Sequence, residues 1–278
     1  MDLNLVKQRL NKLQSKTSNS TFEKIDFATI FWKPKLGKQT VRILPRKSNR
    51  DFPFTEVTFH QYNVFKKNVY SLENFSEKDP VVSLVKDLYN EGTEESKDLA
   101  RKLKPRLKYY AQVLVRNEES AGVRLWEFNK TTYEKLLSIM ADDDFGDITD
   151  LTQGTDLTVE GYNDVIKIGK RDVNYIAVNI TPKRNMSVIH EDAAKVQDYI
   201  ENQKDILEIY KRYSFDEIKN MLKAYINPES AEAEESDDVN IPDVPFVPDE
   251  EPAVRTAAMP AKKAVSTKFD DMFGDDED

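Results

Sequence analysis

The stretch RKLKPRLKYYAQVLVR, residues 101–116, joins a run of bases to an alternating strand pattern and contains no acid. Successive side chains of a strand point to opposite faces of the sheet. The odd-numbered residues from position 107 onward are mostly apolar and predict a core face. The even-numbered ones, which include Lys108, Tyr110 and Arg116, predict a face open to solvent. The stretch therefore predicts a strand with a basic, aromatic outer face, in a chain whose formal net charge is -9.

Short alternating runs of the same kind recur on both sides of this strand along the chain. Joined by turn residues, they are typical of a small barrel or a sandwich. We therefore predict a mostly β body with appended helices. The other runs are TVRIL (40–44), FTEVTF (54–59), GVRLWEF (122–128), LTVEGY (157–162), VIKIG (165–169) and VNYIAVNI (173–180).

Four segments have the apolar spacing and the start signals of helices. Asp79 is placed to cap the first helix. Two capping boxes, Thr131 with Glu134 and Ser214 with Glu217, begin the second and the fourth. The third is predicted as one continuous helix. The four segments are residues 79–89, 131–140, 192–213 and 214–226.

Charge is distributed unevenly along the chain. Residues 229–278 hold 16 acids and 4 bases, whereas residues 1–228 hold 34 acids and 37 bases. The first part is a mildly basic body. The second is a polyanion rich in Glu, Asp and Pro, a composition typical of disorder. A tethered polyanion reaches a high local concentration at a basic surface, and it can occupy that surface until another anionic ligand arrives.

We divide the chain into three parts on these grounds. Residues 1–20 are a basic amphipathic arm for self-association, residues 21–227 are the folded body with a helical C-terminal part, and residues 228–278 are an acidic tail for protein interaction. The alternatives are a frayed terminus for the arm and a merely solubilising tail. The bases of the arm are Lys7, Arg9, Lys12 and Lys16, and the candidate partner-binding residues of the tail are Phe269, Met272 and Phe273.

Residues suited to catalysis or metal binding are scarce. The chain has no cysteine, which excludes disulfides and thiolate zinc sites and favours a reducing compartment. Its histidines, His60 and His190, stand in no motif. The acids from Asp142 to Asp147 lack calcium-loop spacing, so a metal-dependent nuclease is a remote alternative. No apolar run approaches the roughly 18 residues of a membrane span. We predict no enzymatic activity, no cofactor and no metal.

Cations and aromatic side chains interleave on several of the predicted strands. Bases of single-stranded nucleic acid stack on aromatic rings while cations follow the phosphates. The alternative is that the aromatics fill the core, because strands favour them in any case. The candidates from this pattern are Arg42, Lys104, Arg106, Lys108, Tyr110, Arg116, Arg124, Trp126, Lys167 and Tyr175.

The order of motifs resembles that of the single-stranded DNA-binding proteins of T-even-type bacteriophages. The matches are short and scattered, and they cover most of residues 25–180. They are VRILP (41–45), PF (53–54), FKKNVY (65–70), DPVV (79–82), DLYN (87–90), LKYYAQVLV (107–115), WEFNKTTYEKL (126–136) and VIKI with the nearby NY (165–175).

This resemblance implies an OB-fold body that coats single-stranded DNA cooperatively and without sequence preference. The implied setting is phage DNA replication, recombination and repair in the cytoplasm of the infected bacterium. The arm is then expected to contact neighbouring copies along the DNA, and the tail to contact polymerase, helicase loader and recombinase. The implied cleft residues are Arg42, Tyr89, Tyr109, Trp126 and Tyr175, to which the FKKNVY match adds Lys66 and Lys67.

The chain departs from the family at its metal site. Zinc-bearing members carry a CPVC-type pair where this chain has residues 79–82, and His60 lies where the family has a ligand. Without cysteine the zinc site is absent, so we expect apolar packing to replace the metal. Each buried aliphatic side chain contributes about 1.5–3 kcal/mol. The replacing residues are Val81, Leu84, Val85 and Leu88.

One residue assignment and the choice of ligand stay open at this point. Alternation along the strand directs Tyr110 to the cleft, whereas the resemblance directs Tyr109 there, and a β-bulge would reconcile the two. An RNA-binding OB-fold protein and an acidic protein-interaction scaffold are the alternative functions.

Overall fold

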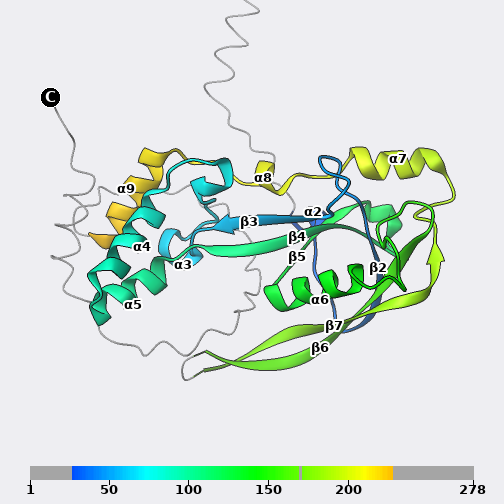
Figure 1. The fold of residues 1–278 in the computed structure, drawn as a ribbon, viewed down its shortest axis with the longest axis horizontal. Coiled ribbons are helices and arrows are strands. Elements are labelled where there is room, and N and C mark those ends of the chain that lie inside the picture. The colour runs from blue at the N-terminus through cyan, green and yellow to red at the C-terminus, as the bar shows by residue number, and fades with distance from the viewer. Residues whose placement is uncertain (1–26, 169–170, 228–278) are drawn as a thin grey trace, which may run out of the picture.

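The computed structural model describes residues 27–168 and 171–227 (Figure 1). The predicted arm and the predicted tail lie outside this range, together with the bases and aromatic residues assigned to them. In the described range one sheet is accompanied by several helices. This confirms the predicted class, mostly β with appended helices.

The seven strands of the described residues form one sheet in the order β1-β5-β4-β2-β6-β7, and β3 pairs with β4 off this path. β1 and β5 pair in parallel, and the other pairs are antiparallel. The arrangement is compatible with the implied OB-fold. The strands are β1 (Phe31–Trp32), β2 (Gly37–Ile43), β3 (Phe54–Phe59), β4 (Arg106–Val115), β5 (Arg124–Phe128), β6 (Gly154–Ile168) and β7 (Arg171–Ser187).

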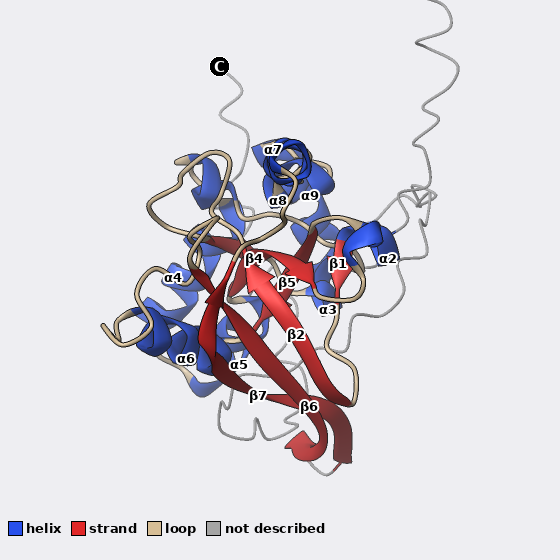
Figure 2. Cartoon of the chain, turned by 90° about the vertical axis from the view of Figure 1, so that its right-hand side faces the viewer, coloured by secondary structure: helices blue, strands red, loops and turns tan. Residues whose placement is uncertain are grey.

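Helices surround the sheet and fill the connections between strands (Figure 2). α3, α4 and α5 lie in the connection from β3 to β4, and α6 follows β5. The remaining helices, from α7 on, follow β7. The helices are α2 (Phe27–Ile30), α3 (Tyr62–Phe65), α4 (Pro80–Glu91), α5 (Glu94–Leu103), α6 (Lys130–Met140), α7 (Ala193–Glu201), α8 (Ile206–Ile209) and α9 (Phe215–Ile226), with 3-10 turns at Leu72–Phe75 and Glu119–Ala121.

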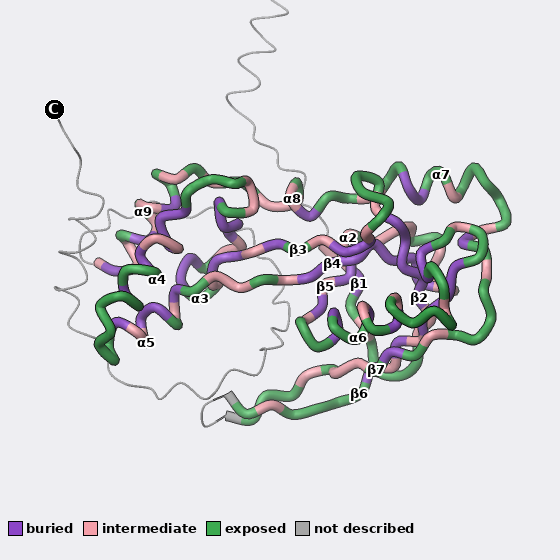
Figure 3. The backbone as a smooth tube through the Cα atoms, viewed as in Figure 1, coloured by how far each residue is buried: buried purple, intermediate pink, exposed green. Residues whose placement is uncertain are grey.

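β4, the strand of the opening stretch, is buried on both of its faces (Figure 3). Its odd-numbered residues from Tyr109 to Val115 join the main core, as predicted, although Leu107 is exposed. The even-numbered face, predicted to be open, is wrong for Tyr110, Gln112 and Leu114, which are buried. The physical reason is the chain after β7, whose apolar side chains cover this face: Ile189, Tyr199, Ile200 and Ile206.

The helices α3, α4 and α5 pack with α9 around a second apolar cluster (Figure 1). Capping explains where α4 starts, because the Asp79 side chain accepts hydrogen bonds from the N–H groups of Val81 and Val82 at 2.9 and 3.2 Å. The four residues expected to pack in place of a metal are buried in this cluster: Val81, Leu84, Val85 and Leu88.

A buried polar contact stands beside these apolar residues. Nε2 of His60 lies 2.9 Å from Oδ2 of Asp79, although the two atoms are not aligned for a hydrogen bond, and both side chains are almost fully buried. Oδ2 also accepts from the Ser71 hydroxyl and the Leu72 N–H. Burial raises the pKa of Asp79, but the contact with His60 and the backbone N–H groups outweigh burial, so the pKa lies below its ordinary value.

Three predicted element boundaries are corrected by the structure. The segment 192–213 is two helices, because Asp205 caps α8 after a break that follows α7. α6 begins one residue earlier than predicted, and its cap is Asn129 rather than Thr131, since the Asn129 side chain accepts from the Thr132 N–H. The segment 157–162 and residues 165–168 of the next predicted segment belong to one long strand, β6. The capping box of Ser214 and Glu217 is confirmed.

β6 and β7 form a long hairpin that continues past the rest of the sheet (Figures 1 and 2). β2 pairs with β6 as far as Gly37 opposite Gly161, so the residues beyond this point pair with each other alone. The outer hairpin, residues 162–177, is exposed or half-buried along its described length (Figure 3). It is the part of the sheet that is available to a ligand on both faces.

Candidate nucleic-acid interface

Arg42 is fully buried, which corrects the expectation of an outward-facing cleft arginine. Its strand runs between β4 and β6, and the chain around residues 150–154 and 187 closes over the side chain. Nε donates to Asp156 at 2.8 Å, and the terminal nitrogens donate to the carbonyl oxygens of Asp150, Gly154 and Ser187. The guanidinium therefore ties the turn before β6 to the end of β7.

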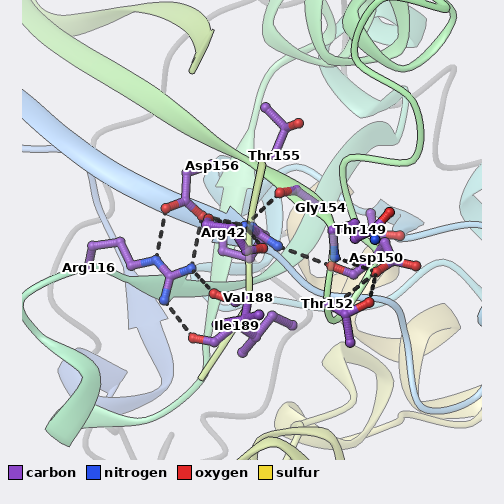
Figure 4. Close-up of polar contacts among 12 residues, drawn as sticks. Arg42, Arg116, Thr149, Asp150, Thr152, Gly154, Thr155, Asp156, Val188 and Ile189 are labelled. Atoms are coloured by element: carbon purple, nitrogen blue, oxygen red, sulfur yellow. Dashed lines mark hydrogen bonds and ion pairs between the residues drawn. The ribbon is translucent and has the colours of Figure 1, made fainter. Parts of the chain in front are cut away.

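Arg116 shares the same carboxylate from the neighbouring strand (Figure 4). Its Nε donates to Asp156 at 3.0 Å, and its terminal nitrogens donate to the carbonyls of Val188 and Ile189. Burial raises the pKa of Asp156, but the hydrogen bonds from Arg116 and the charge of Arg42 outweigh burial, so the pKa lies below its ordinary value. We call Arg42, Arg116 and Asp156 the arginine clamp, and we assign it a structural role at the base of the hairpin.

The three aromatic residues expected in a cleft on β4 and β5 are also buried. Tyr109 stacks on Tyr133 with ring centroids 4.2 Å apart. Tyr110 points to the other face of the strand and donates its hydroxyl to Glu127 at 2.9 Å. Trp126 packs edge-on against Trp32 in the main core. Pairing of β4 with β3 and β5 keeps one register through both tyrosines, so a bulge does not turn either of them outward.

The cations predicted on β4 and β5 are engaged within the fold. Lys108 forms an ion pair with Glu127 at 3.0 Å and lies over the ring of Phe59. Arg124 forms an ion pair with Glu118 at 2.7 Å. Arg106, at the start of β4, is half-buried. The acids Glu127 and Glu118 therefore offset positive charge that the sequence predicted for these strands.

A second group of predicted residues is exposed on the helical part. Lys66 and Lys104 are exposed, and Gln61 holds their segments together by donating its side-chain amide to the Lys104 carbonyl at 2.8 Å. Lys67 is half-buried, with its ammonium 4.7 Å from the ring centroid of Tyr213. Tyr89 on α4 is 41% exposed. This surface therefore offers cations and an aromatic ring to a ligand.

The third group lies on the outer hairpin. Lys167 is exposed near the tip, and Tyr175 is half-buried, with its hydroxyl donating to Asp164 at 3.1 Å. Tyr162, which the sequence reasoning did not select, is 48% exposed on the opposite strand. The available signal was the Gly-Tyr-Asn sequence at 161–163, where an aromatic residue directly follows the glycine that ends the pairing with β2.

The predicted site residues include one group that is engaged in contacts within the body and another whose side chains are exposed. Arg42 and Arg116 converge on one acid, and Tyr110 and Lys108 converge on another, so these four stabilise the body. The predicted residues with exposed side chains are Lys66, Tyr89, Lys104 and Lys167. They occur on the helical part and on the hairpin, which runs along the body toward the side where α4 and α5 lie (Figure 1).

A search of the described residues for other kinds of site gives two results. No group of three or more His, Cys, Asp or Glu side chains in these residues is arranged to hold a metal ion. None of the helices in the described part of the chain combines the length and the apolarity needed to cross a membrane.

Comparison with known proteins identifies the family of this fold. The model of the family described as gp32 DNA binding protein like matches residues 35–227, which is more than half of the chain. A comparison with curated proteins gave no match. The matched range starts just before β2 and ends just after α9, so it contains the sheet except for β1, together with the hairpin and the helical part. The chain therefore belongs to the gp32-like family of DNA-binding proteins.

Proposed function

We propose that the protein binds single-stranded DNA cooperatively and with little sequence preference, during phage DNA replication, recombination and repair. The observation that carries this proposal is the family match over residues 35–227. It is supported by the exposed aromatic residues and exposed cations that both the hairpin and the helical part carry. Aromatic rings receive any base, and cations follow the phosphates, so such surfaces bind single strands without reading their sequence.

The segments outside the described residues complete the proposal. Residues 1–20 act as a self-association arm between neighbouring copies on the DNA. Residues 228–278, which carry all of the acidic excess of the chain, bind polymerase, helicase loader and recombinase and compete with DNA for the basic surface. The protein acts in the cytoplasm of the infected bacterium and catalyses no reaction.

Binding of the full-length protein to oligo(dT) should depend steeply on salt. Neutralising phosphates releases counterions, and for single strands the logarithmic slope is roughly -0.7 per phosphate contact. Three contacts therefore predict a loss of affinity of more than about tenfold between 50 and 200 mM salt. Fluorescence anisotropy of labelled short and long oligo(dT) at several salt concentrations measures this slope and the cooperativity together. An affinity that does not change with salt would overturn the proposal.

A competition assay separates the alternatives. Unlabelled oligo(U) of matched length should displace labelled oligo(dT) less effectively than unlabelled oligo(dT) does. Stronger displacement by oligo(U) identifies an RNA-binding protein instead. Absence of binding to both oligomers identifies a protein-interaction scaffold.

Removal of residues 229–278 should strengthen binding to short oligo(dT) severalfold at low salt and less at high salt. The deleted segment carries 16 acids and 4 bases, and a tethered polyanion competes for a basic surface at high effective concentration. The matched control keeps the length of the tail but replaces its acids by Asn and Gln, and it should behave like the deletion. Unchanged affinity of both variants at low salt would show that the tail does not compete with DNA.

A further inference from the structure

A hollow of about 550 Å³ lies next to Gly161 of β6, and none of the sites described above includes it. Its walls come from the start of α6 and from the facing segments of β6 and β7. Val178 and Ile180, on the core side of β7, line it together with Asn179, on the other side, and Thr131 and Lys135 of α6 add polar groups, so the hollow lies at the edge of β7. Volumes of roughly 300–1,000 Å³ are typical of small-molecule sites, so the hollow has room for a flat heteroaromatic ring with polar edges.

Strand register shows which hairpin side chains share a face with Asn179, one of the residues that line the hollow. Residues directly opposite each other in an antiparallel pair point to the same face. Glu160 is opposite Asn179, Tyr162 is opposite Ala177, and Asp164 is opposite Tyr175. Because Ala177 is small, the ring of Tyr162 has no bulky side chain directly across from it. Tyr162 and Tyr175 are diagonal neighbours on this one face.

The opposite face of the hairpin is closed at the same level. A Cβ atom added to Gly161 would lie only 2.2 Å from the carbonyl oxygen of Lys35, so the loop between β1 and β2 packs directly on that backbone. Pairing with β2 also ends at Gly161. Tyr162 is therefore the first residue of β6 beyond the pairing with β2. The loop between β1 and β2 packs on one face of the backbone at this level, and the Tyr162 side chain is exposed on the other face.

Cations stand on both sides of this ring. Lys135 of α6 is exposed and donates a hydrogen bond to the side chain of Asn179 across the hollow. Nζ of Lys38 lies 3.9 Å from Oε1 of Glu160, which shares the face of Tyr162. A base stacked on Tyr162 would have phosphates within reach of flexible ammonium groups on the sheet and on the helix. The polar edges and the nearby cations favour a nucleotide over an apolar side chain of a protein partner.

We propose that this hollow holds a base of the bound single strand, stacked on the ring of Tyr162, with Lys135 contacting the adjacent phosphate. The strand continues along the same hairpin face to Tyr175. This site rests on the proposed function, because it assigns a base position to the same DNA-binding activity. It adds a binding residue, Tyr162, that neither the sequence pattern nor the resemblance selected.

The test compares three substitutions at one position in the full-length protein, with short oligo(dT) at fixed salt. Tyr162→Leu and Tyr162→Ala should each weaken binding by about 5- to 150-fold, the range for loss of one stacked base. Tyr162→Phe keeps the ring and should bind like the wild type. Val165→Ala changes an exposed side chain on the opposite hairpin face, and it should also bind like the wild type. Thermal melting of each variant shows that the hairpin and body remain folded.

A second measurement reads the contact directly. Ultraviolet cross-linking of the wild type to oligo(dT), followed by peptide mass spectrometry, should place a cross-link on Tyr162. If the wild type fails to bind oligo(dT), the proposed function itself is wrong. If the wild type binds, but Tyr162→Leu binds equally well and no cross-link maps to Tyr162, the base site is wrong while the proposed function stands.

Discussion

Replacing Arg42 by alanine should lower the free energy of unfolding by about 3–5 kcal/mol, the usual cost of removing one partner of a buried ion pair. The substitution leaves the Asp156 carboxylate with Arg116 alone. It also leaves the carbonyl oxygens of Asp150, Gly154 and Ser187 without the donor that they share. Chemical denaturation at pH 7 measures the loss, and the midpoint should shift strongly.

The matched control lies on the same strand. Lys38 forms an exposed ion pair with Glu160 at 3.9 Å, and exposed pairs contribute only about 0–1 kcal/mol. Lys38→Ala should therefore leave the midpoint nearly unchanged. Arg42→Lys should also destabilise the protein, because one ammonium group cannot replace a guanidinium fork that reaches four partners. If Arg42→Ala unfolds like the wild type but binds DNA weakly, Arg42 is a DNA contact and the clamp has been misassigned.

The position of Arg42 shows that strand alternation can be predicted from the sequence, whereas the covering of a sheet face cannot. Because TVRIL alternates, Val41 and Ile43 are expected on the core face, and they are buried there. The same alternation placed Arg42 on the other face, but it assumed that this face meets water. Whether this face of β2 is covered depends on segments that are far away in the sequence, here the turn at 150–154 and the end of β7. A pattern confined to one strand does not contain that information.

Tyr109 and Tyr110 make the same point for the candidate site. Their alternation was predicted correctly, since they join different apolar clusters on the two faces of β4. The assumption that one of the two faces is open to a ligand was wrong, because both tyrosines are buried. Two helix caps, at Asp79 and Ser214, were predicted correctly, because a cap depends only on neighbouring residues along the helix. The exposed Tyr162 was missed because its exposure follows from where pairing with β2 ends, a fact of topology.

Replacing Asp79 by alanine should destabilise the protein by about 3–5 kcal/mol at pH 7. One carboxylate caps α4 through two backbone N–H groups, accepts from Ser71 and Leu72, and lies 2.9 Å from Nε2 of His60. Alanine removes all of these partners and leaves the buried imidazole without its acid. Since α4 packs against α9 in the second cluster, the loss should appear as cooperative melting of the helical part.

Asp192 supplies the control for the capping part of this effect. Its side chain caps α7 by accepting from the Ala194 N–H, but the residue is exposed, so Asp192→Ala should cost only about 1 kcal/mol. Asp79→Asn keeps an acceptor oxygen for the cap and replaces Oδ2 by an amide group, so it tests the contacts of Oδ2 with His60, Ser71 and Leu72 together. Equal destabilisation by Asp79→Ala and Asp192→Ala would mean that the buried contact contributes nothing.

The stability of the Asp79 variants should also differ in its dependence on pH. The pKa of Asp79 in the folded protein lies below its ordinary value, which is about 3.9 in an unfolded chain. A lowered carboxyl pKa stabilises the fold fully above the unfolded value, and this stabilisation is lost as the pH falls through the folded value. The difference in unfolding free energy between the wild type and Asp79→Asn should therefore be largest above about pH 5 and shrink toward pH 2. A difference that stays constant across this range would show that the charge of Asp79 does not stabilise the helical part, and that α4 is held by its apolar face and cap alone.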